Sequence, residues 1–422
     1  MKVLVVGSGG REHAIAWKLL QSPTVEQCFC LPGNGGTAIL KGCENVEVKL
    51  DNFLGITEVC QQQHIDLVVV GPEFPLTLGI TDHLQRHNIA VFGPTKTGSQ
   101  LESSKSWAKN LMQEAGIPIA QGETFTEIEA AKDYARQQGA PIVVKADGLA
   151  AGKGVIVAQT IAEAEAAIAD LFASGFDKIL VEECLIGEEV SVLALTDGIT
   201  VRPLLPAQDH KRIGEGDTGP NTGGMGSYAP APIATEKLIQ QVTSTILQPT
   251  VKALQQRGID YRGVLYAGLM VTPAGKVKVL EYNCRFGDPE TQAILPLLDT
   301  PLDQLMMACV EQRLARCPPI SWHHGSAICV VLASGGYPGA YEKGKLISGT
   351  DTAETAGAQV FHAGTSLQAD QLVTIGGRVL GITGQGESFE TACQLAYEAI
   401  EAIDFEGKYY RRDIGYRAHK ST

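Results

Sequence analysis

The stretch that decides the fold reads Pro141-Ile142-Val143-Val144-Lys145-Ala146-Asp147-Gly148-Leu149-Ala150-Ala151-Gly152-Lys153-Gly154-Val155-Ile156-Val157. Two runs rich in Val and Ile predict strands, and a loop of Gly, Ala and Lys separates them. A Walker P-loop would read G-x-x-x-x-G-K, then Ser or Thr, and lead into a helix. Here the spacing is one residue short, Gly154 replaces the hydroxyl residue, and a strand follows. The stretch therefore predicts a hairpin whose backbone amides and Lys153 close over a polyphosphate.

Two further lysines are candidates for the same site. Lys145 stands at the end of the first strand, two residues before the loop. It either extends along the sheet edge into solvent or faces the phosphates, and its closeness to a glycine-rich loop favours the second interpretation. Lys105 falls in the first turn of a helix that Ser103 or Ser104 caps. It is either solvated or binds an anion together with the helix end, and both interpretations stay open.

A strand-and-helix unit lies on each side of the hairpin. Capping boxes that begin at Thr126 and Thr160 predict the two helix starts, and Gly139 and Gly175 predict the ends. After the second unit, the run Lys178–Glu189 leaves a buried strand for a turn crowded with carboxylates. Solvated surface would explain such charges in isolation. Their place directly after a buried strand favours a site for a base and a ribose.

A metal site is predicted where the chain reads Glu281-Tyr282-Asn283-Cys284-Arg285-Phe286-Gly287-Asp288-Pro289-Glu290. Residues two apart in a strand face the same side, so Glu281 and Asn283 present two oxygens together. Such a pair suits Mg²⁺, which takes few protein oxygens and completes its shell with water and phosphate. A surface pair beside a turn is the alternative, and Arg285 and Asp288 close by make it less favoured.

A polar segment, residues 208–228, separates the predicted nucleotide site from a helix at about 236–256 and strands at 263–271 and 276–281. We expect this segment to be a structureless loop. Loops of this length in compact domains are usually functional.

The first hundred residues alternate apolar runs with helical patterns. The runs are 3–6, 28–31, 67–70 and 90–92, and helices are predicted at about 12–21, 57–64 and 78–87. This alternation is typical of a parallel, doubly wound α/β sheet. Ligands bind such sheets at the carboxyl ends of the strands, where three of these runs enter turns of Gly and Pro.

The first of these turns, Gly7-Ser8-Gly9-Gly10-Arg11-Glu12, begins like a dinucleotide-binding fingerprint. Glu12 replaces the third glycine, and the second strand ends in Pro32-Gly33-Asn34 without an acidic residue for a ribose. A nicotinamide site is therefore not expected. The turn amides and Arg11 favour a phosphate or carboxylate group of a substrate, the alternative being a tight turn alone.

The composition limits the classes of function. The 422 residues suggest about three domains, and 34 Lys and Arg against 47 Asp and Glu give a net charge of −13. An acidic chain without a basic patch argues against nucleic-acid and membrane-surface partners, and no apolar run reaches the roughly 18 residues of a membrane span. We expect a cytoplasmic protein, because the chain begins with a strand rather than a secretory signal. Its ten scattered cysteines indicate buried thiols.

The composition changes after Pro318-Pro319, and the rest of the chain predicts an α+β unit with strands at 326–333 and 378–383 and a helix at 388–403. The turn at 334–339 is either punctuation or a rim of the site. We predict an α/β protein with domains at 1–100, 101–325 and 326–422, in which residues 120–190 form a lid subdomain.

The order of the glycine loop, the lysines, the acidic turn and the Glu281–Asn283 pair resembles that of the ATP-grasp enzymes. Among them, the chain is similar to the phosphoribosylamine–glycine ligase family, and the segments that carry this similarity are Gly7–Ala14, Lys145–Val155, Gln208–Arg212, Gly219–Gly226, Arg285–Glu290 and Arg412–Gly415. The similarity spans the whole chain. It implies a Rossmann-like substrate-binding domain, a central ATP-grasp domain and a C-terminal α+β domain.

The resemblance implies an ATP-dependent carbon–nitrogen ligase that joins glycine to 5-phosphoribosylamine in purine (IMP) synthesis. It implies release of ADP and phosphate through a glycyl phosphate, Mg²⁺ or Mn²⁺ on Glu281 and Asn283, and catalytic roles for Lys145, Arg285 and Asp288. The implied ATP contacts are Lys105, Lys145, Gly148, Gly152, Lys153, Gly154, Glu182, Glu183, Leu185 and Glu189. The implied substrate contacts are Gly9, Gly10, Arg11, Gly71, Glu73, Asp209, Lys211, Asn221, Thr222, Gly223, Arg285 and Gly287. We expect small-molecule partners only, in a monomer or weak dimer.

Two other functions remain open at this point. A sister ATP-grasp ligase that uses another purine intermediate would share the ATP motifs but not residues 285–290 as written. A nucleotide-binding regulator without catalysis would be expected to lose the metal pair, which is intact here.

Overall fold

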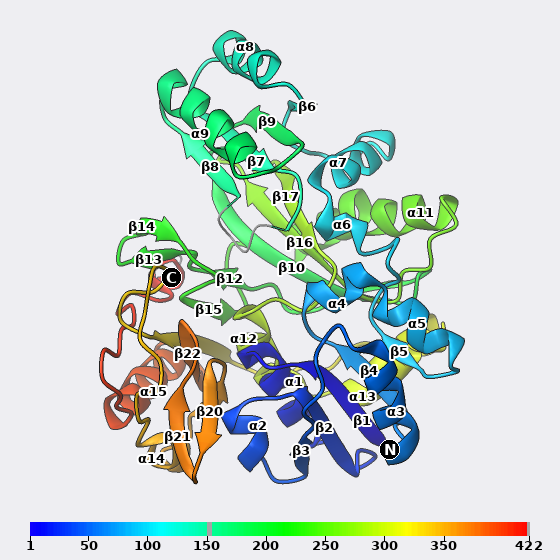
Figure 1. Ribbon diagram of the computed structural model, residues 1–422, viewed down its shortest axis with the longest axis vertical. Helices are drawn as coiled ribbons and strands as arrows, with labels where there is room; N and C mark the ends of the chain where they lie inside the picture. Colours follow the sequence, from blue (N-terminus) through cyan, green and yellow to red (C-terminus); the bar gives the residue numbers. More distant parts are fainter. Residues whose placement is uncertain (150–153, 420–422) are drawn as a thin grey trace.

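The computed structural model describes residues 1–149 and 154–419. Figure 1 shows the N-terminal part (blue) and the C-terminal part (orange and red) side by side, with the helices α8 and α9 at the opposite end of the molecule. The central part of the chain lies between them. Within the described residues, no helix is long and apolar enough to cross a membrane.

The N-terminal part is a five-stranded parallel sheet in the order β3-β2-β1-β4-β5. Its strands are β1 (Lys2–Gly7), β2 (Gln27–Pro32), β3 (Cys43–Asn45), β4 (Leu67–Val70) and β5 (Val91–Phe92). Its helices are α1 (Gly10–Leu19), α2 (Gly35–Ile39), α3 (Phe53–Gln63), α4 (Glu73–Leu78) and α5 (Ile80–Arg86). The strand order reverses direction at β1, so the predicted doubly wound sheet is confirmed. The short elements β3 and α2 were not predicted, because neither carries an apolar run.

The lid sheet is antiparallel, in the order β6-β9-β7-β8, and α8 (Ile128–Gln138) and α9 (Ile161–Ala173) pack on it. Its strands are β6 (Gly122–Phe125), β7 (Ile142–Ala146), β8 (Val155–Ala158) and β9 (Ile179–Glu183). The predicted hairpin is confirmed, because β7 and β8 pair from Ile142↔Ala158 to Lys145↔Val155. Thr160 caps α9 as predicted. The prediction for Thr126 is wrong, because α8 starts two residues later with Glu127 at the N-cap.

A second antiparallel sheet, in the order β11-β10-β16-β17, faces the lid. Its strands are β10 (Glu188–Thr196), β11 (Val201–Pro203), β16 (Gly263–Val271) and β17 (Val277–Asn283), accompanied by α6 (Gln100–Ser103) and α7 (Lys105–Glu114). Ser104 caps α7 through the amide of Trp107, at 3.2 Å. The helix predicted at 236–256 is interrupted: α10 (Glu236–Val242) and α11 (Gln248–Gln256) flank a π-helical turn at Thr243–Leu247. Pro249 lacks the N–H that a regular helix would use there.

The C-terminal sheet has the order β12-β15-β18-β22-β19. It is built from β18 (Ser326–Ala333), β19 (Gln359–His362), β22 (Arg378–Gly386) and two strands from the polar segment, β12 (Gln208–Asp209) and β15 (Gly226–Ala229). The hairpin β20 (Thr365–Gln368)–β21 (Gln371–Thr374) and the helices α14 (Thr350–Thr355), α15 (Phe389–Ala402) and α16 (Tyr416–His419) complete this part.

The expectation of a structureless loop at 208–228 is therefore wrong. Its backbone groups pair with β18 and with one another, in a second hairpin formed by β13 (Arg212–Gly214) and β14 (Thr218–Asn221). Pairing of this kind satisfies backbone groups that would otherwise be buried without partners.

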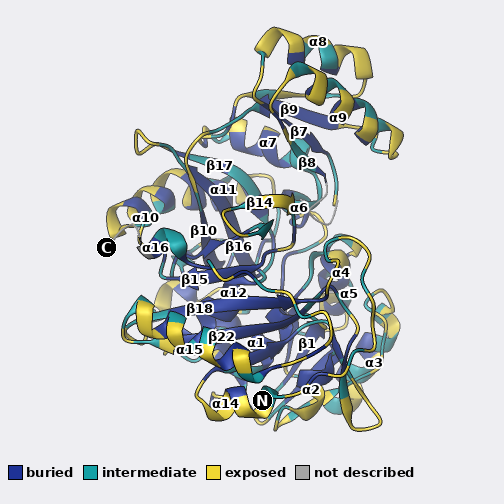
Figure 2. Cartoon of the chain, turned by 90° about the vertical axis from the view of Figure 1, so that its left-hand side faces the viewer, coloured by how far each residue is buried: buried dark blue, intermediate teal, exposed yellow. Residues whose placement is uncertain are grey.

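The hydrophobic core divides the molecule into a main body and the lid. Two large apolar clusters combine residues of the N-terminal, central and C-terminal parts, whereas a third is confined to the lid. Every residue of α12 (Glu290–Leu297) is buried, and α13 (Leu302–Val310) lies close to it in the same cluster. Figure 2 shows the buried strands of the lid beneath the exposed outer faces of α8 and α9. All ten cysteines are free thiols.

Candidate active site

A cavity of about 920 Å³ lies between the lid, the second central sheet, the N-terminal turns and the C-terminal part. Many residues predicted from distant parts of the sequence meet there. Those that line it are Arg11, Glu73, Lys105, Lys145, Gly148, Glu182, Glu183, Leu185, Glu189, Asp209, Lys211, Asn221, Thr222, Gly223, Glu281, Asn283, Arg285 and Asp288. Gly152 and Lys153 lie outside the described residues.

Lys145 is held by a buried carboxylate. It forms an ion pair with Glu182 and donates to the carbonyl of Leu280 at 3.1 Å. The other oxygen of Glu182 accepts from Lys109 at 2.9 Å, and Lys109 also donates to the carbonyl of Ala120 at 2.8 Å. Glu182 therefore joins two lysines at the cavity wall, which leaves it little capacity to accept from a ribose.

Lys105 begins α7 at the cavity wall and donates to the carbonyl of Gly148 at 2.9 Å. Burial lowers the pKa of this lysine, although Glu281 acts in the opposite direction. Lys105 is thus half-buried and lies where the hairpin loop leaves β7. This position favours the anion-binding interpretation over a solvated lysine.

The predicted metal pair lies at the end of β17 beside a third lysine. Lys211 is 3.0 Å from Glu189 and 3.6 Å from Glu281. Burial alone would raise the pKa of Glu281, but Lys211, Lys145 and Lys105 hold it below its usual value, so the carboxyl is ionised. The amide oxygen of Asn283 accepts from Arg285 at 2.9 Å. Two hard oxygen donors of one strand therefore face the cavity together, as the spacing predicts.

Arg285 is clamped between acidic groups. Its guanidinium lies 2.7 Å from Glu102 and 3.3 Å from Glu73. Burial works against the charge, but these two carboxylates raise the pKa of Arg285 above its ordinary value. Glu102 was missed by sequence reasoning, since nothing in the short helix α6 marks it as paired.

At the first glycine turn, where an anion site is predicted, the carboxylate of Glu12 already accepts from one turn amide and pairs with Arg11. The amide of Gly9 donates to Glu12 at 2.6 Å, and Arg11 is 2.5 Å from the same carboxylate. Gly71 leaves room for this side chain, because a Cβ there would collide with it. Arg11 also donates to the carbonyl of Phe286 at 3.0 Å.

Of the predicted glycines that the structure describes, Gly9, Gly10, Gly71, Gly154 and Gly287 are not among the residues that line the cavity. A Cβ at Gly10 would collide with Gln292, and one at Gly287 would collide with Glu290. The carbonyl of Gly154 accepts from the amide of Ala146 at 2.7 Å, which closes the end of the hairpin. The contacts of Gly9, Gly10, Gly71, Gly154 and Gly287 with ligands stay predictions.

The C-terminal part also supplies residues of the cavity: Tyr337 lies in the turn at 334–339, where a rim of the site was one of two interpretations, whereas the sequence did not suggest Arg378 and Arg417. Arg378, the first residue of β22, donates to the carbonyls of Gly223 and Asp288 at 2.8 and 2.9 Å. Burial would raise the pKa of Asp288, but Arg378 and Arg11 hold it below its usual value. Tyr337 and Arg417 line the same face, and they lie more than a hundred residues from the polar segment.

An apolar cleft between the lid and the second sheet was also missed. It is lined by Met112, Ile119, Val143, Val157, Leu180, Met270 and Val279. These side chains come from α7, from the linker after it and from strands of both sheets. Alternation along the strands could have indicated them, since one face of each strand must be apolar.

Asp209, on the short strand β12, lines the cavity near Lys211 and Glu290. Burial raises the pKa of this carboxyl to about 7, although Lys211 acts in the opposite direction and Glu290 adds to the rise. Tyr266 donates to Glu290 at 2.6 Å in the same wall. This wall is rich in oxygen acceptors and suits a ligand that carries N–H donors.

The comparisons with known proteins agree along the whole chain. Residues 1–102, 103–291 and 327–417 match the N, ATP-grasp (A) and C domains of phosphoribosylglycinamide synthetase. A phosphoribosylamine–glycine ligase of Synechocystis sp. is 65% identical, over 99% of this chain and 100% of that protein. The trifunctional purine biosynthetic protein adenosine-3 of Gallus gallus is 50% identical over 99% of this chain and 42% of its own length.

Solved structures give the same result. The crystal structure of phosphoribosylamine–glycine ligase from Thermotoga maritima superposes with a TM-score of 0.84 at 35% identity, covering 98% of this chain and 100% of that one. A biotin carboxylase domain from Hydrogenobacter thermophilus shares the fold, with a TM-score of 0.72 at 16% identity over 97% of this chain and 91% of that one. The chain belongs to the phosphoribosylglycinamide synthetase family, with an ATP-grasp domain at its centre.

Proposed function

We propose that this protein joins glycine to 5-phosphoribosylamine at the expense of ATP, giving glycinamide ribonucleotide, ADP and phosphate in purine synthesis. The observation that carries the proposal is one cavity in which an apolar cleft, three lysines and an ionised carboxylate–amide pair meet. Membership of the family supports the choice of substrates.

The cavity offers a place for each part of ATP. The cleft between the two antiparallel sheets suits the flat face of a base, and the backbone at 184–185, which lines the cavity, would meet its edge; the amide of Glu183 is already bonded to the carbonyl of Gln121 at 2.8 Å. Glu189 is the carboxylate assigned to the ribose, because it lines the cavity and is more exposed than Glu182, which is enclosed by Lys109 and Lys145; Glu189 itself pairs with Lys211. The phosphates would then extend toward Lys105 and Lys145 beneath the hairpin loop.

The donor set at the end of β17 fits a small divalent cation. Glu281 is ionised and Asn283 adds a neutral oxygen, which is the chemistry Mg²⁺ or Mn²⁺ prefers. Among the described residues, no group of three or more His, Cys, Asp or Glu could hold a metal by itself. The ion would therefore depend on the phosphates of ATP for the rest of its shell, and it would supply positive charge at the transferred group.

The reaction needs positioning and charge rather than an enzyme nucleophile. The carboxylate of glycine attacks the γ-phosphate, ADP leaves, and the amine of phosphoribosylamine then displaces phosphate from glycyl phosphate. Lys105 and Lys145 neutralise the charge on the phosphates, and Lys211 binds substrate. Arg285, fixed between Glu73 and Glu102, orients the anionic group of the substrate, and the ionised Asp288 accepts a hydrogen bond from the attacking amine.

The test measures ADP release with glycine and phosphoribosylamine supplied separately and together. Glycine with heavy oxygen in its carboxylate should transfer one labelled oxygen to phosphate for each amide formed. Alanine in place of glycine is the control, and it should release little ADP. Unlabelled phosphate alongside normal product would contradict the acyl-phosphate route.

A further inference from the structure

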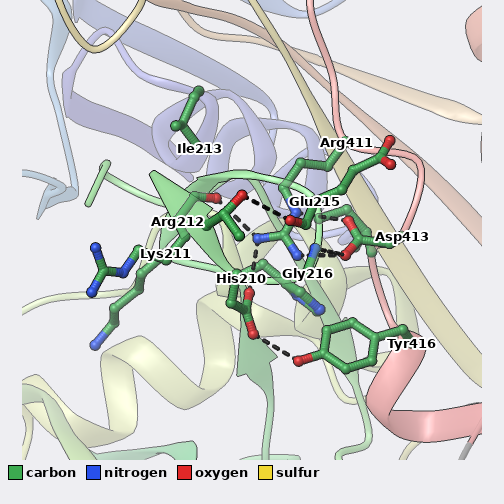
Figure 3. Close-up of polar contacts among 12 residues, drawn as sticks. His210, Lys211, Arg212, Ile213, Glu215, Gly216, Arg411, Asp413 and Tyr416 are labelled. Atoms are coloured by element: carbon green, nitrogen blue, oxygen red, sulfur yellow. Dashed lines mark hydrogen bonds and ion pairs between the residues drawn. The ribbon is translucent and has the colours of Figure 1, made fainter. Parts of the chain in front are cut away.

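The polar segment that carries Asp209, Lys211, Asn221 and Thr222 has a second face, which contacts Arg411, Asp413 and Tyr416, and these three residues are not among those that line the cavity. Asp217 on this face and its partner Arg417 also reach the cavity lining. We call residues 209–222 the substrate loop. The C-terminal segment 409–417, here the C-terminal clamp, lies against that second face (Figure 3). The two segments are about two hundred residues apart in the chain, so their contact belongs to the tertiary fold alone.

Arg411 is the central residue of the clamp. It has no exposed surface, and it donates to both carboxylate oxygens of Asp413 at 2.8 Å. It also donates to the carboxylate of Asp217 and to the carbonyl of Arg212, each at 2.9 Å. A buried guanidinium must have its charge and donors satisfied. Arg411 therefore holds Arg212 and Asp217 of the loop close to each other.

Asp413 and Tyr416 add two further hydrogen bonds between the clamp and the loop. Asp413 accepts from the amide of Gly216 at 2.8 Å, at the turn of the β13–β14 hairpin. The hydroxyl of Tyr416 donates to Asp217 at 2.7 Å. The turn is thus held by hydrogen bonds to charged groups, which are stronger than those between neutral partners.

The clamp also reaches the start of the loop. Arg417 forms an ion pair with Asp217 and donates to the carbonyl of Asp209 at 3.2 Å. The amide of Gly415 donates to Nε2 of His210 at 3.2 Å. Burial, together with Arg417 and Arg411, lowers the pKa of His210 to about 3, so this ring stays neutral and accepts that bond.

The opposite face of the loop points into the cavity. Figure 3 shows the side chain of Lys211 extending away from Arg411 and Asp413. Lys211 reaches Glu189 and Glu281 instead, and Asn221 and Thr222 line the cavity on the same side. Strand β14 is largely exposed, so apolar packing contributes little to holding it.

We propose that the C-terminal clamp is a positioning element, in which Arg411, Asp413 and Tyr416 hold the substrate loop in the arrangement that binds glycine and phosphoribosylamine. The inference rests on the proposed function, since it requires the loop to bind these two substrates. In the proposed arrangement, ATP lies between the lid and the second sheet, so its binding should depend much less on the clamp.

The experiment compares Tyr416→Phe with Tyr410→Phe. Both variants keep the ring and lose one hydroxyl of the same segment, but the hydroxyl of Tyr410 donates to Glu401 on α15, at 3.1 Å, and not to the loop. Tyr416→Phe should raise the KM for glycine or phosphoribosylamine on the order of tenfold, as expected for a hydrogen bond to a carboxylate. The KM for ATP should stay within about twofold, and the Tm should fall by no more than about 4 °C, because one partly exposed hydrogen bond is lost. Tyr410→Phe should resemble the parent protein.

A double-mutant cycle with Asp217→Asn adds a readout that a general structural effect would not give. If Tyr416 acts through Asp217, the KM of the double variant should be no higher than that of the more impaired single variant. Equal effects of Tyr416→Phe and Tyr410→Phe, or an unchanged KM for all substrates in Tyr416→Phe, would overturn the clamp.

Lys211→Ala distinguishes failure of the clamp from failure of the proposed function. If the KM for glycine or phosphoribosylamine rises in Lys211→Ala but is unchanged in Tyr416→Phe, the clamp is overturned and the proposed function stands. An unchanged KM for glycine and phosphoribosylamine in Lys211→Ala would show that the loop does not bind them, and it would overturn both. A raised KM in both variants supports the clamp.

Discussion

Replacing Glu182 by Gln tests whether the lysines of the ATP site depend on one buried charge. The carboxylate joins Lys109, at 2.9 Å, to Lys145. The side chains of the three residues are 6%, 5% and 9% exposed, so water cannot replace the lost charge. The substitution keeps the shape of the side chain and one acceptor oxygen.

The expected loss of stability follows from this burial. Removing one partner of a buried ion pair costs about 3–5 kcal/mol, because the other charge is left uncompensated. Gln retains a hydrogen-bond acceptor, so we expect the lower end, about 3 kcal/mol, in the free energy of unfolding. Lys145 also loses the contact that aims it at the cavity, and the KM for ATP should rise on the order of tenfold.

Urea unfolding followed by circular dichroism gives the first quantity, and steady-state kinetics gives the second. Glu165→Gln is the matched control, because Glu165 pairs with Arg136 on the outer surface of the lid at 2.6 Å. Water screens that pair, so both measurements should stay close to those of the parent protein. A loss below about 1 kcal/mol in Glu182→Gln would refute the reasoning on burial, and an unchanged KM for ATP would refute the role of Lys145.

Three further predictions concern the metal pair, the hairpin and the clamp. Glu281→Ala should lower kcat on the order of a hundredfold with the fold intact by circular dichroism, and a near-normal rate at saturating Mg²⁺ would contradict the metal assignment. Gly148 has a φ of +136°, so Gly148→Ala should strain the backbone by roughly 1–3 kcal/mol and weaken ATP binding in calorimetry; unchanged binding would contradict a role for this turn. Burial opposes ionisation of Asp217, but Tyr416 and Arg411 lower its pKa to about 2, below an unfolded value of about 3.9. The stability this gives is complete above the unfolded pKa and lost as pH falls toward 2, so Asp217→Asn should show a shallower loss of stability between pH 4 and 2 in urea unfolding, and parallel curves would contradict it.

Local patterns predicted the parts of the molecule in which neighbours in sequence are neighbours in space. The alternation of runs and helices gave the parallel sheet, and the Val-rich strands around the glycine loop gave the β7–β8 hairpin. The two-residue spacing placed Glu281 and Asn283 on one side of β17. Each of these inferences depends only on the spacing of residues along neighbouring stretches of the chain.

The residues that were missed act across long separations. Arg378 reaches Gly223, Glu102 reaches Arg285, and Arg417 reaches Asp209. No periodicity links such pairs, because their proximity follows from how the sheets pack. Glu182 shows the same limit, since its two ion pairs join it to Lys109 and to Lys145 on other elements, and its contact with ATP stays a prediction.

The polar segment explains why the C-terminal part is more than an appended domain. Strand β15 pairs with β18 from Gly226↔Val330 to Ala229↔Ala327, so a piece of the central chain completes the C-terminal sheet. Without it, the buried strand β18 would present an unpaired apolar edge. The same segment carries Lys211 on its cavity face and Asp217 against Arg411 on the other. One continuous segment pairs with the sheet edge, contacts the clamp and lines the cavity. A substitution at any of these three places should therefore alter the structure at the other two.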